Sequence, residues 1–190
     1  MARLLLGLIL WCLVAAAIAG GGTTDLAGET DVAVDYRDGL YSGHLRMRVP
    51  VRPEAALAVL TDFDHMADFV PNLTTSRVVQ RAGNVYRVAQ EGNAEFGPFT
   101  FRFASERRIE VFPEGRVVSR VISGSFRPMH SELRLQPAGP EETRIDYRIE
   151  MAPAIWMPSA IGTNFLRHEL AEQFAAMARE MVRRERSAAP

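Results

Sequence analysis

The sequence predicts an α+β domain in which a curved antiparallel sheet packs against one long C-terminal helix. From Asp35 onward the hydrophobic residues alternate mainly with period two, in segments joined by short turns. Such alternation is typical of an antiparallel sheet with one solvated face. Residues 159–186 contain no proline and carry hydrophobic residues at helical spacing instead. They therefore predict a long helix with one apolar face, which the apolar face of the sheet can bury.

The first 19 residues predict a secretory signal peptide. Arg3 precedes an apolar run that ends in Ala-Ile-Ala at Ala19, which is the layout of a signal sequence with an A-x-A cleavage site. We expect cleavage after Ala19 and a periplasmic or secreted location, with an uncleaved membrane anchor as the alternative. The rest of the chain divides into a flexible leader at 20–33, one ligand-binding domain at 34–186 and a disordered tail at 187–190.

The composition excludes two classes of protein. Removal of residues 1–19 takes away Arg3 and Cys12, so 21 basic residues, 23 acidic residues and no cysteine remain. Without an excess of positive charge, no nucleic-acid partner is expected. Without cysteines there is no disulfide framework, and the domain must gain its stability from a hydrophobic core.

The first predicted strand, HLRMRVPV (44–51), alternates apolar and polar residues. The next segment, PEAALAVLTDF (53–63), predicts a short helix because Pro53 suits the first helical position and apolar residues follow at helical spacing. A second short helix is expected over 64–69, ending by Pro71.

Six further strands are predicted as pairs around short turns rich in glycine and proline. They are SRVVQR and VYRVAQE, FTFRFASERRIEVF and RVVSRVISGSF, and SELRLQ and TRIDYRIEMA. The whole sheet is thus expected to have about six to seven strands. The apolar face of the C-terminal helix is formed by Leu166, Leu170, Phe174, Met177 and Met181.

A long helix lying across a curved antiparallel sheet is the helix-grip fold. The stretch VPVRPEAALAVLTDFDHMADFVPNLTTSRVV (49–79), the strand block that ends in ETRIDYRIEMAP, and the terminal helix resemble the START-like (SRPBCC) superfamily. Within it they resemble the bacterial polyketide cyclase/dehydrase and lipid-transport family, which includes the coenzyme-Q-binding START proteins. The resemblance covers residues 34–186. It implies a hydrophobic cavity between the sheet and the C-terminal helix that opens near the two short helices.

Twelve residues are candidates for this cavity. In the family that the chain resembles, the segment with Phe69, Val70 and Pro71 shapes the cavity mouth. The full candidate set is Phe63, Phe69, Val70, Pro71, Phe101, Phe103, Arg107, Tyr147, Trp156, Met157, Phe165 and His168. Trp156 and Met157 fit two readings equally: an apolar staple over the start of the long helix, or a rim that makes transient contact with a membrane.

Arg107 and His168 are the polar members of the set. Arg107 has the same strand parity as Phe101 and Phe103, and a cation on an apolar face needs a partner or a ligand. A β-bulge between Ser105 and Arg108 that turns Arg107 outward, or a structural ion pair, is favoured over ligand contact. His168 is expected at the edge of the helix stripe, with ligand contact as the less favoured reading.

The stretch TDFDHMADF (61–69) places acids and a histidine close together. It matches no H-E-x-x-H or EF-hand pattern, so capping of the second short helix by Asp62 or Asp64 is favoured over a metal or catalytic site. No metal site, no cofactor and no catalytic residue is predicted.

Three functions remain open. The favoured one is binding or transport of a hydrophobic small molecule, such as a lipid, a quinone or a polyketide-like compound. A cyclase or dehydratase acting on a polyketide-like substrate is the alternative, and would need Arg107 or His168 as an acid or base inside the cavity. The third is a ligand-free protein-interaction module with an exposed apolar patch around Trp156. The oligomeric state is left open.

Overall fold

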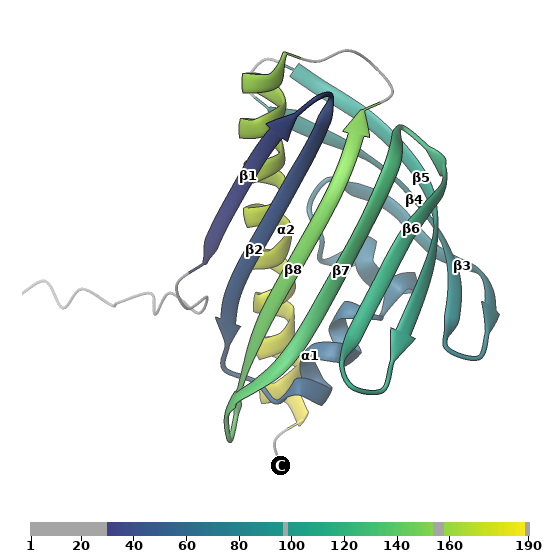
Figure 1. Cartoon of the computed structure of the whole chain (residues 1–190). Helices are drawn as coiled ribbons and strands as arrows, with labels where there is room; N and C mark the ends of the chain where they lie inside the picture. Colours follow the sequence, from purple (N-terminus) through teal and green to yellow (C-terminus); the bar gives the residue numbers. More distant parts are fainter. Residues whose placement is uncertain (1–29, 97–98, 154–157, 189–190) are drawn as a thin grey trace, which may run out of the picture.

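The structure is a computed structural model that describes residues 30–96, 99–153 and 158–188. In chain order its elements are β1 (Asp31–Arg37), β2 (Leu40–Val49), α1 (Pro53–Leu60), the 3-10 helix η1 (Phe63–Asp68), β3 (Leu73–Ala82), β4 (Val85–Phe96), β5 (Phe99–Phe112), β6 (Arg116–Gly124), β7 (Phe126–Gly139), β8 (Glu142–Pro153) and α2 (Ser159–Ala188). The predicted helix-grip fold is confirmed, because α2 crosses one face of a curved antiparallel sheet (Figure 1). No helix in the described ranges has both the length and the hydrophobicity of a membrane span.

The sheet has eight strands in the order β1-β2-β8-β7-β6-β5-β4-β3, and every neighbouring pair is antiparallel. All but one of these pairs join strands that follow each other in the chain. The exception is β2 with β8, where Tyr41 lies opposite Met151 and Val49 opposite Thr143. This pairing joins the first hairpin to the last strand.

Strand β1 corrects the predicted domain boundary and strand count. It begins at Asp31, inside the segment predicted as a flexible leader and before the predicted domain start at residue 34. Only Val34 of this strand is buried, so its hydrophobic signal is weak. Asp38 and Gly39 form the turn to β2 with φ values of 52° and 85°, a left-handed pair that Asp-Gly adopts readily in hairpins. At the other end, α2 runs on into the predicted tail as far as Ala188.

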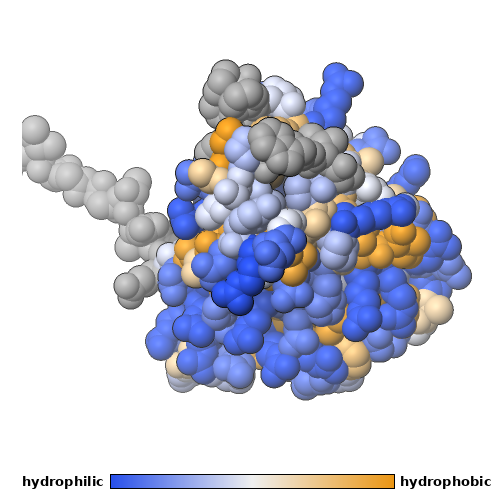
Figure 2. Space-filling model, turned by 45° about the horizontal axis from the view of Figure 1, so that its top comes forward, coloured by the Kyte–Doolittle hydropathy of each residue, from blue (hydrophilic) through white to orange (hydrophobic). Residues whose placement is uncertain are grey.

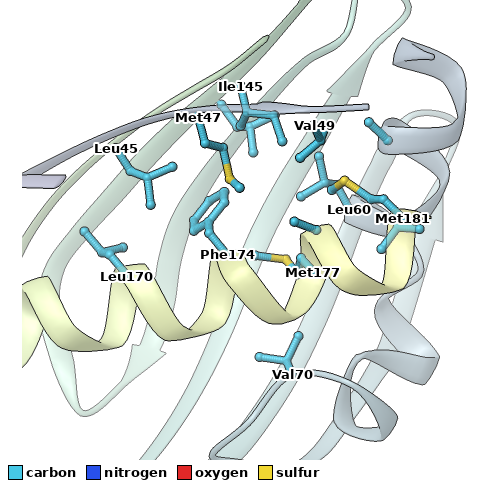
Figure 3. Packing of buried hydrophobic residues seen from close by; sticks show 14 of the residues in the cluster. Leu45, Met47, Val49, Leu60, Val70, Ile145, Leu170, Phe174, Met177 and Met181 are labelled. Carbon is cyan, nitrogen blue, oxygen red and sulfur yellow. The ribbon is translucent and has the colours of Figure 1, made fainter. Parts of the chain in front are cut away.

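The hydrophobic core lies between β2, β8 and α2. Leu45, Met47 and Ile145 point from the sheet toward Leu170 and Phe174 on the helix (Figure 3). The alternation read from the sequence explains this layer, because Arg46 and Arg48, which alternate with the buried residues of β2, are exposed. Burial of each such side chain stabilises the fold by about 1.5–3 kcal/mol.

Helix α2 sits against one half of the sheet. Its main backbone contacts are with β1, β2 and α1. Gly43 of β2 allows this close approach, since a Cβ atom there would lie 2.8 Å from Leu170 Cδ1 and 2.9 Å from Ile149 Cγ2. The other half of the sheet curves away, and β3 packs on η1 instead. A space is therefore left between α2, η1 and the middle strands.

Candidate functional site

The space between the sheet and α2 is a cavity of about 210 Å³ that is partly open to the surface. Its wall is mainly apolar and includes Val70 after η1, Phe103 on β5, Leu133 on β7, and Phe165 and Phe174 on α2. A smaller space of about 60 Å³ adjoins it and shares part of its lining, namely Phe103, Phe126, Met151, Phe165 and Leu166. Ligand pockets are typically about 300–1,000 Å³, so the two spaces together suit a small ligand.

Arg107 lines the cavity from β5 and is oriented by a chain of hydrogen bonds. Its Nη2 donates to Gln90 Oε1, and Gln90 Nε2 donates to Ser76 Oγ at 3.0 Å. Ser76 Oγ in turn donates to the Phe63 carbonyl oxygen at 2.5 Å. Because the amide nitrogen of Gln90 is already used, its oxygen is held toward the guanidinium, which stays fixed in the cavity.

The charge of Arg107 is not neutralised within the described part of the chain. No carboxylate there lies within 4.0 Å of its guanidinium, and its buried Nε has no hydrogen-bond acceptor. Burial lowers the pKa of Arg107 below its usual value, and nearby Tyr147 opposes this shift. Burial also raises the pKa of Tyr147, against contributions from Ser131 and Arg107. The cavity thus contains an uncompensated cation beside a neutral phenol.

A bulge does accompany Arg107, but it lies in the partner strand. The β5–β6 register passes from Glu106 opposite Ser123 to Arg107 opposite Val121, so the extra residue is Ile122 of β6, which is exposed. The alternation of β5 is therefore unbroken, and Arg107 keeps the inward parity of Phe103. Arg107 thus does not turn outward as predicted, and it forms no ion pair with any residue that the structure describes.

A second polar group, Glu169, reaches the cavity from α2. It is 6% exposed, and its carboxylate accepts hydrogen bonds from Asn72 Nδ2 at 3.2 Å and Gln173 Nε2 at 3.0 Å. Burial raises the pKa of Glu169, although these two hydrogen bonds oppose the shift. Asn72 adopts a positive φ of 68°, so the segment after η1 turns sharply and its amide reaches the helix.

His168, Glu169 and Glu172 are the one set of potential metal ligands found in the described ranges, with ligand atoms within 4.8 Å of one another. The Asn72 amide already donates to both carboxylates, and would have to be displaced by a cation. The arrangement is explained without a metal, because the Asn72 amide donates to both carboxylates and His168 Nε2 lies 3.8 Å from Glu172.

The structure places most of the candidate residues at the cavity. Six line the main cavity: Phe63, Val70, Phe103, Arg107, Tyr147 and Phe165. Phe101 lines the smaller space and stacks with Phe165 at a ring-centroid distance of 5.1 Å. Phe69 and Pro71 are half-buried and belong to neither lining. Trp156 and Met157 lie outside the described residues.

His168 is not where the candidate set requires it. Its side chain is 51% exposed and lies 3.8 Å from Glu172, and it lines neither space. Its neighbour Glu169 occupies the inward position, since one residue on a helix is a rotation of about 100°. The sequence does not indicate that Glu169 is buried, because acids are seldom buried without partners and its partners Asn72 and Gln173 become visible only in the fold.

Asp62 and Asp64 do not cap η1, contrary to the prediction. Asp62 instead accepts hydrogen bonds from His65 Nδ1 at 2.6 Å and Arg184 Nη1 at 2.8 Å, which joins η1 to α2. Burial would raise the pKa of Asp62, but these two bonds outweigh it and lower the pKa. Asp64 Oδ1 accepts the Val78 backbone N–H at 2.7 Å, which joins η1 to β3. The acids therefore hold one wall of the cavity in place.

Glu180 extends this network and gives the protein an acid-sensitive link. Hydrogen bonds from Arg183 at 2.7 Å and Arg184 at 2.6 Å lower the pKa of Glu180 to about 2. A depressed carboxyl pKa contributes stability above the ordinary value of 4.5, and this stability is lost as the pH falls from 4.5 toward 2. We expect Glu180→Gln to lower the melting temperature at pH 7 and to flatten its decline below pH 4.5. Thermal unfolding of both proteins from pH 7 to pH 2 measures this, and parallel declines would contradict it.

Comparison with known proteins identifies one family. The family model described as "Polyketide cyclase / dehydrase and lipid transport" matches residues 49–178. A comparison with curated proteins gives no significant match.

Solved structures share the fold at low sequence identity. They include the Zhui aromatase/cyclase from Streptomyces sp. R1128, with a TM-score of 0.69, 13% identity and coverage of 79% of this chain and 98% of that one. A START superfamily protein from Mycobacterium smegmatis has a TM-score of 0.66 at 11% identity, covering 75% and 97%. A STAR-related lipid transfer protein from Xanthomonas axonopodis has a TM-score of 0.55 at 12% identity, and the match covers 80% of this chain and 98% of that one. These likenesses establish the common fold.

Proposed function

Because the chain belongs to the polyketide cyclase/dehydrase and lipid transport family, we propose that it binds a hydrophobic small molecule in the cavity between the sheet and α2. The observation that carries this proposal is the cavity itself: a mainly apolar space of about 210 Å³, partly open to the surface, beside a packed hydrophobic core. Interiors are normally filled to crystal-like density. An apolar ligand in this space would give its lining the contacts that such interiors normally have.

The ligand is a lipid, a quinone or a polyketide-like compound, and the protein carries or stores it in the periplasm or outside the cell. The location is supported by the signal peptide that the sequence predicts in residues 1–19. Burial of the ligand provides the driving force, at about 25 cal/mol per Å² of apolar surface. Extraction of the purified protein with organic solvent, followed by mass spectrometry, tests the proposal. A stoichiometric hydrophobic compound is expected, and an empty protein that also fails to take up any apolar probe would refute it.

A second candidate is a cyclase or dehydratase, and Glu169 is the observation that favours it. A buried carboxyl with a raised pKa inside a cavity is suited to general acid–base work. The sequence suggested His168 as the acid or base inside the cavity, but His168 is exposed. In this second candidate function, Glu169 takes that role. The test is turnover of a β-hydroxy ketone to the conjugated enone plus water, followed by absorbance. Glu169→Gln should abolish turnover and the more exposed Glu172→Gln should spare it; no turnover by the unaltered protein would reject this role.

The described surface gives little support to a ligand-free interaction module. Figure 2 shows a face on which hydrophilic residues predominate and hydrophobic ones form small groups among them. Within the described residues, the large exposed hydrophobic side chains are Tyr36 on β1, Val79 on β3 and Ile122 on β6, and no two of these strands are neighbours. The patch predicted around Trp156 lies outside the described residues.

A further inference from the structure

Hydrogen-bond donors form a row across the cavity wall. Arg107 on β5, Ser119 on β6, Ser131 on β7 and Tyr147 on β8 all line the cavity. Ser119 and Ser131 are directly opposite each other, and the register places Arg107 and Tyr147 diagonally next to them. We call these four residues the donor row. Each of the four can donate an N–H or O–H, and none is an acid.

No acidic side chain balances the positive charge of Arg107 in the donor row. Gln90 accepts from only one guanidinium nitrogen of Arg107, and the buried Nε has no acceptor in the described part of the chain. Among the described residues, the Glu169 carboxylate is bound to Asn72 and Gln173 and forms no ion pair with Arg107. The acid on α2 therefore does not neutralise the cation on β5, although both line the same cavity.

An isolated charge inside an apolar cavity is costly, and proteins normally pair it. Even a buried ion pair can often be replaced by apolar residues of similar volume without loss of stability, so the fold itself does not require this cation. The cation here is also supported by its own hydrogen-bond chain through Gln90 and Ser76 to the Phe63 carbonyl. A fixed donor with an unused N–H is the arrangement expected for recognition of an acceptor group on a ligand.

We propose that the ligand carries one anionic group, a carboxylate or a phosphate, which binds Arg107 at the donor row while its apolar part fills the remaining cavity. The proposal rests on the proposed binding function and narrows the class of ligand. A neutral carbonyl would satisfy the free N–H but would leave the charge uncompensated. An anion does both, and the hydroxyls of Ser119, Ser131 and Tyr147 are placed to donate to its other lone pairs.

Four probes that share one alkyl chain test the head group: decanoate, decyl phosphate, methyl decanoate and 1-decanol. Binding to the solvent-extracted protein is measured by isothermal titration calorimetry at pH 7.5. At least one of the two anions is expected to bind at least about 10-fold more tightly than both neutral probes, and the tighter anion names the head group. Tighter binding of methyl decanoate or 1-decanol would overturn the proposal.

Arg107→Gln removes the charge but keeps a polar side chain, and Arg108→Gln is its matched control because Arg108 is the adjacent, exposed residue of the same strand. We expect Arg107→Gln to weaken binding of the preferred anion by about 100-fold and of methyl decanoate by no more than about 3-fold. Arg108→Gln should change neither. Circular dichroism and thermal unfolding check that both variants fold. Equal losses for the anion and the ester in Arg107→Gln would overturn the proposal.

The two proposals fail in different ways. If the neutral probes bind and the anions do not, or if hydrophobic compounds co-purify and no probe binds, the anion site is rejected and the binding function stands. If nothing co-purifies and no probe binds, both are rejected.

Discussion

Replacing Gly92 with alanine is expected to lower the free energy of unfolding by about 3 kcal/mol or more. A Cβ atom at this position of β4 would lie 1.9 Å from the Asn72 carbonyl oxygen and 2.6 Å from Phe103 Cζ. The first of these atoms is backbone and is fixed, because it accepts a hydrogen bond from the Asn93 N–H at 2.9 Å. The segment after η1 must therefore move away from β4. That movement disturbs Phe103, which lines the cavity, so ligand binding should weaken as well.

Urea denaturation measures this loss, and Gly139→Ala is the matched control. A Cβ atom at Gly139 would meet Glu142 Cβ at 3.6 Å, an ordinary contact. The control should change the stability by no more than about 0.5 kcal/mol. Equal free energies of unfolding for the two variants would show that the Asn72 backbone does not lie as close to Gly92 as the structure indicates.

Leu45→Ala is expected to cost about 4 kcal/mol, and Leu133→Ala no more than about 2 kcal/mol, although the two substitutions remove the same atoms. Leu45 is 0% exposed, belongs to the packed core under α2, and leaves a new hole when it is truncated. Leu133 is also buried, at 6%, but one side of it already faces the cavity. It therefore loses fewer dispersion contacts, and truncation enlarges a space that already exists.

The pair of leucine variants tests whether the cavity is open in solution. Both are measured by urea denaturation, and apolar probe binding is followed in Leu133→Ala, where a larger cavity should admit a bulkier ligand. If Leu133→Ala lowers the free energy of unfolding as much as Leu45→Ala does and binds no bulkier probe, the space between the sheet and α2 is closed in solution.

The fold was predictable because its elements repeat their pattern over many residues. The alternation on β8 and the apolar stripe on α2 each involve several residues of one kind, so single exceptions do not hide them. Strand β1 was missed because it buries one side chain, Val34, and rests on its neighbour β2. Its clearest sequence signal is the Asp38-Gly39 dipeptide, which is a strong marker of a tight hairpin.

The polar residues of the site were harder to predict, because their positions depend on contacts distant in the chain. The sequence correctly places Arg107 on the same face of its strand as Phe103. Whether a bulge turns it outward depends on which strand contains the extra residue, and that strand is β6. Gln90 and Glu169 were not singled out at all. The role of Gln90 follows from its hydrogen bonds with Ser76 and Arg107. The burial of Glu169 follows from its hydrogen bond with Asn72, which is far away in the sequence. A single sequence shows neither relation.

The pairing of β2 with β8 has a consequence for how the protein folds. Every other strand pair is a local hairpin that can form as soon as its two strands exist. The β2–β8 pair joins residues far apart in the chain, such as Tyr41 and Met151, so among the strand pairs it closes the largest loop and meets the largest entropy cost. Folding rates fall as such distant contacts increase. The cavity also needs α2, the last element of the chain. The cavity can therefore form only after α2 has been synthesised and has packed against the sheet, so a nascent chain that lacks α2 cannot hold a ligand there.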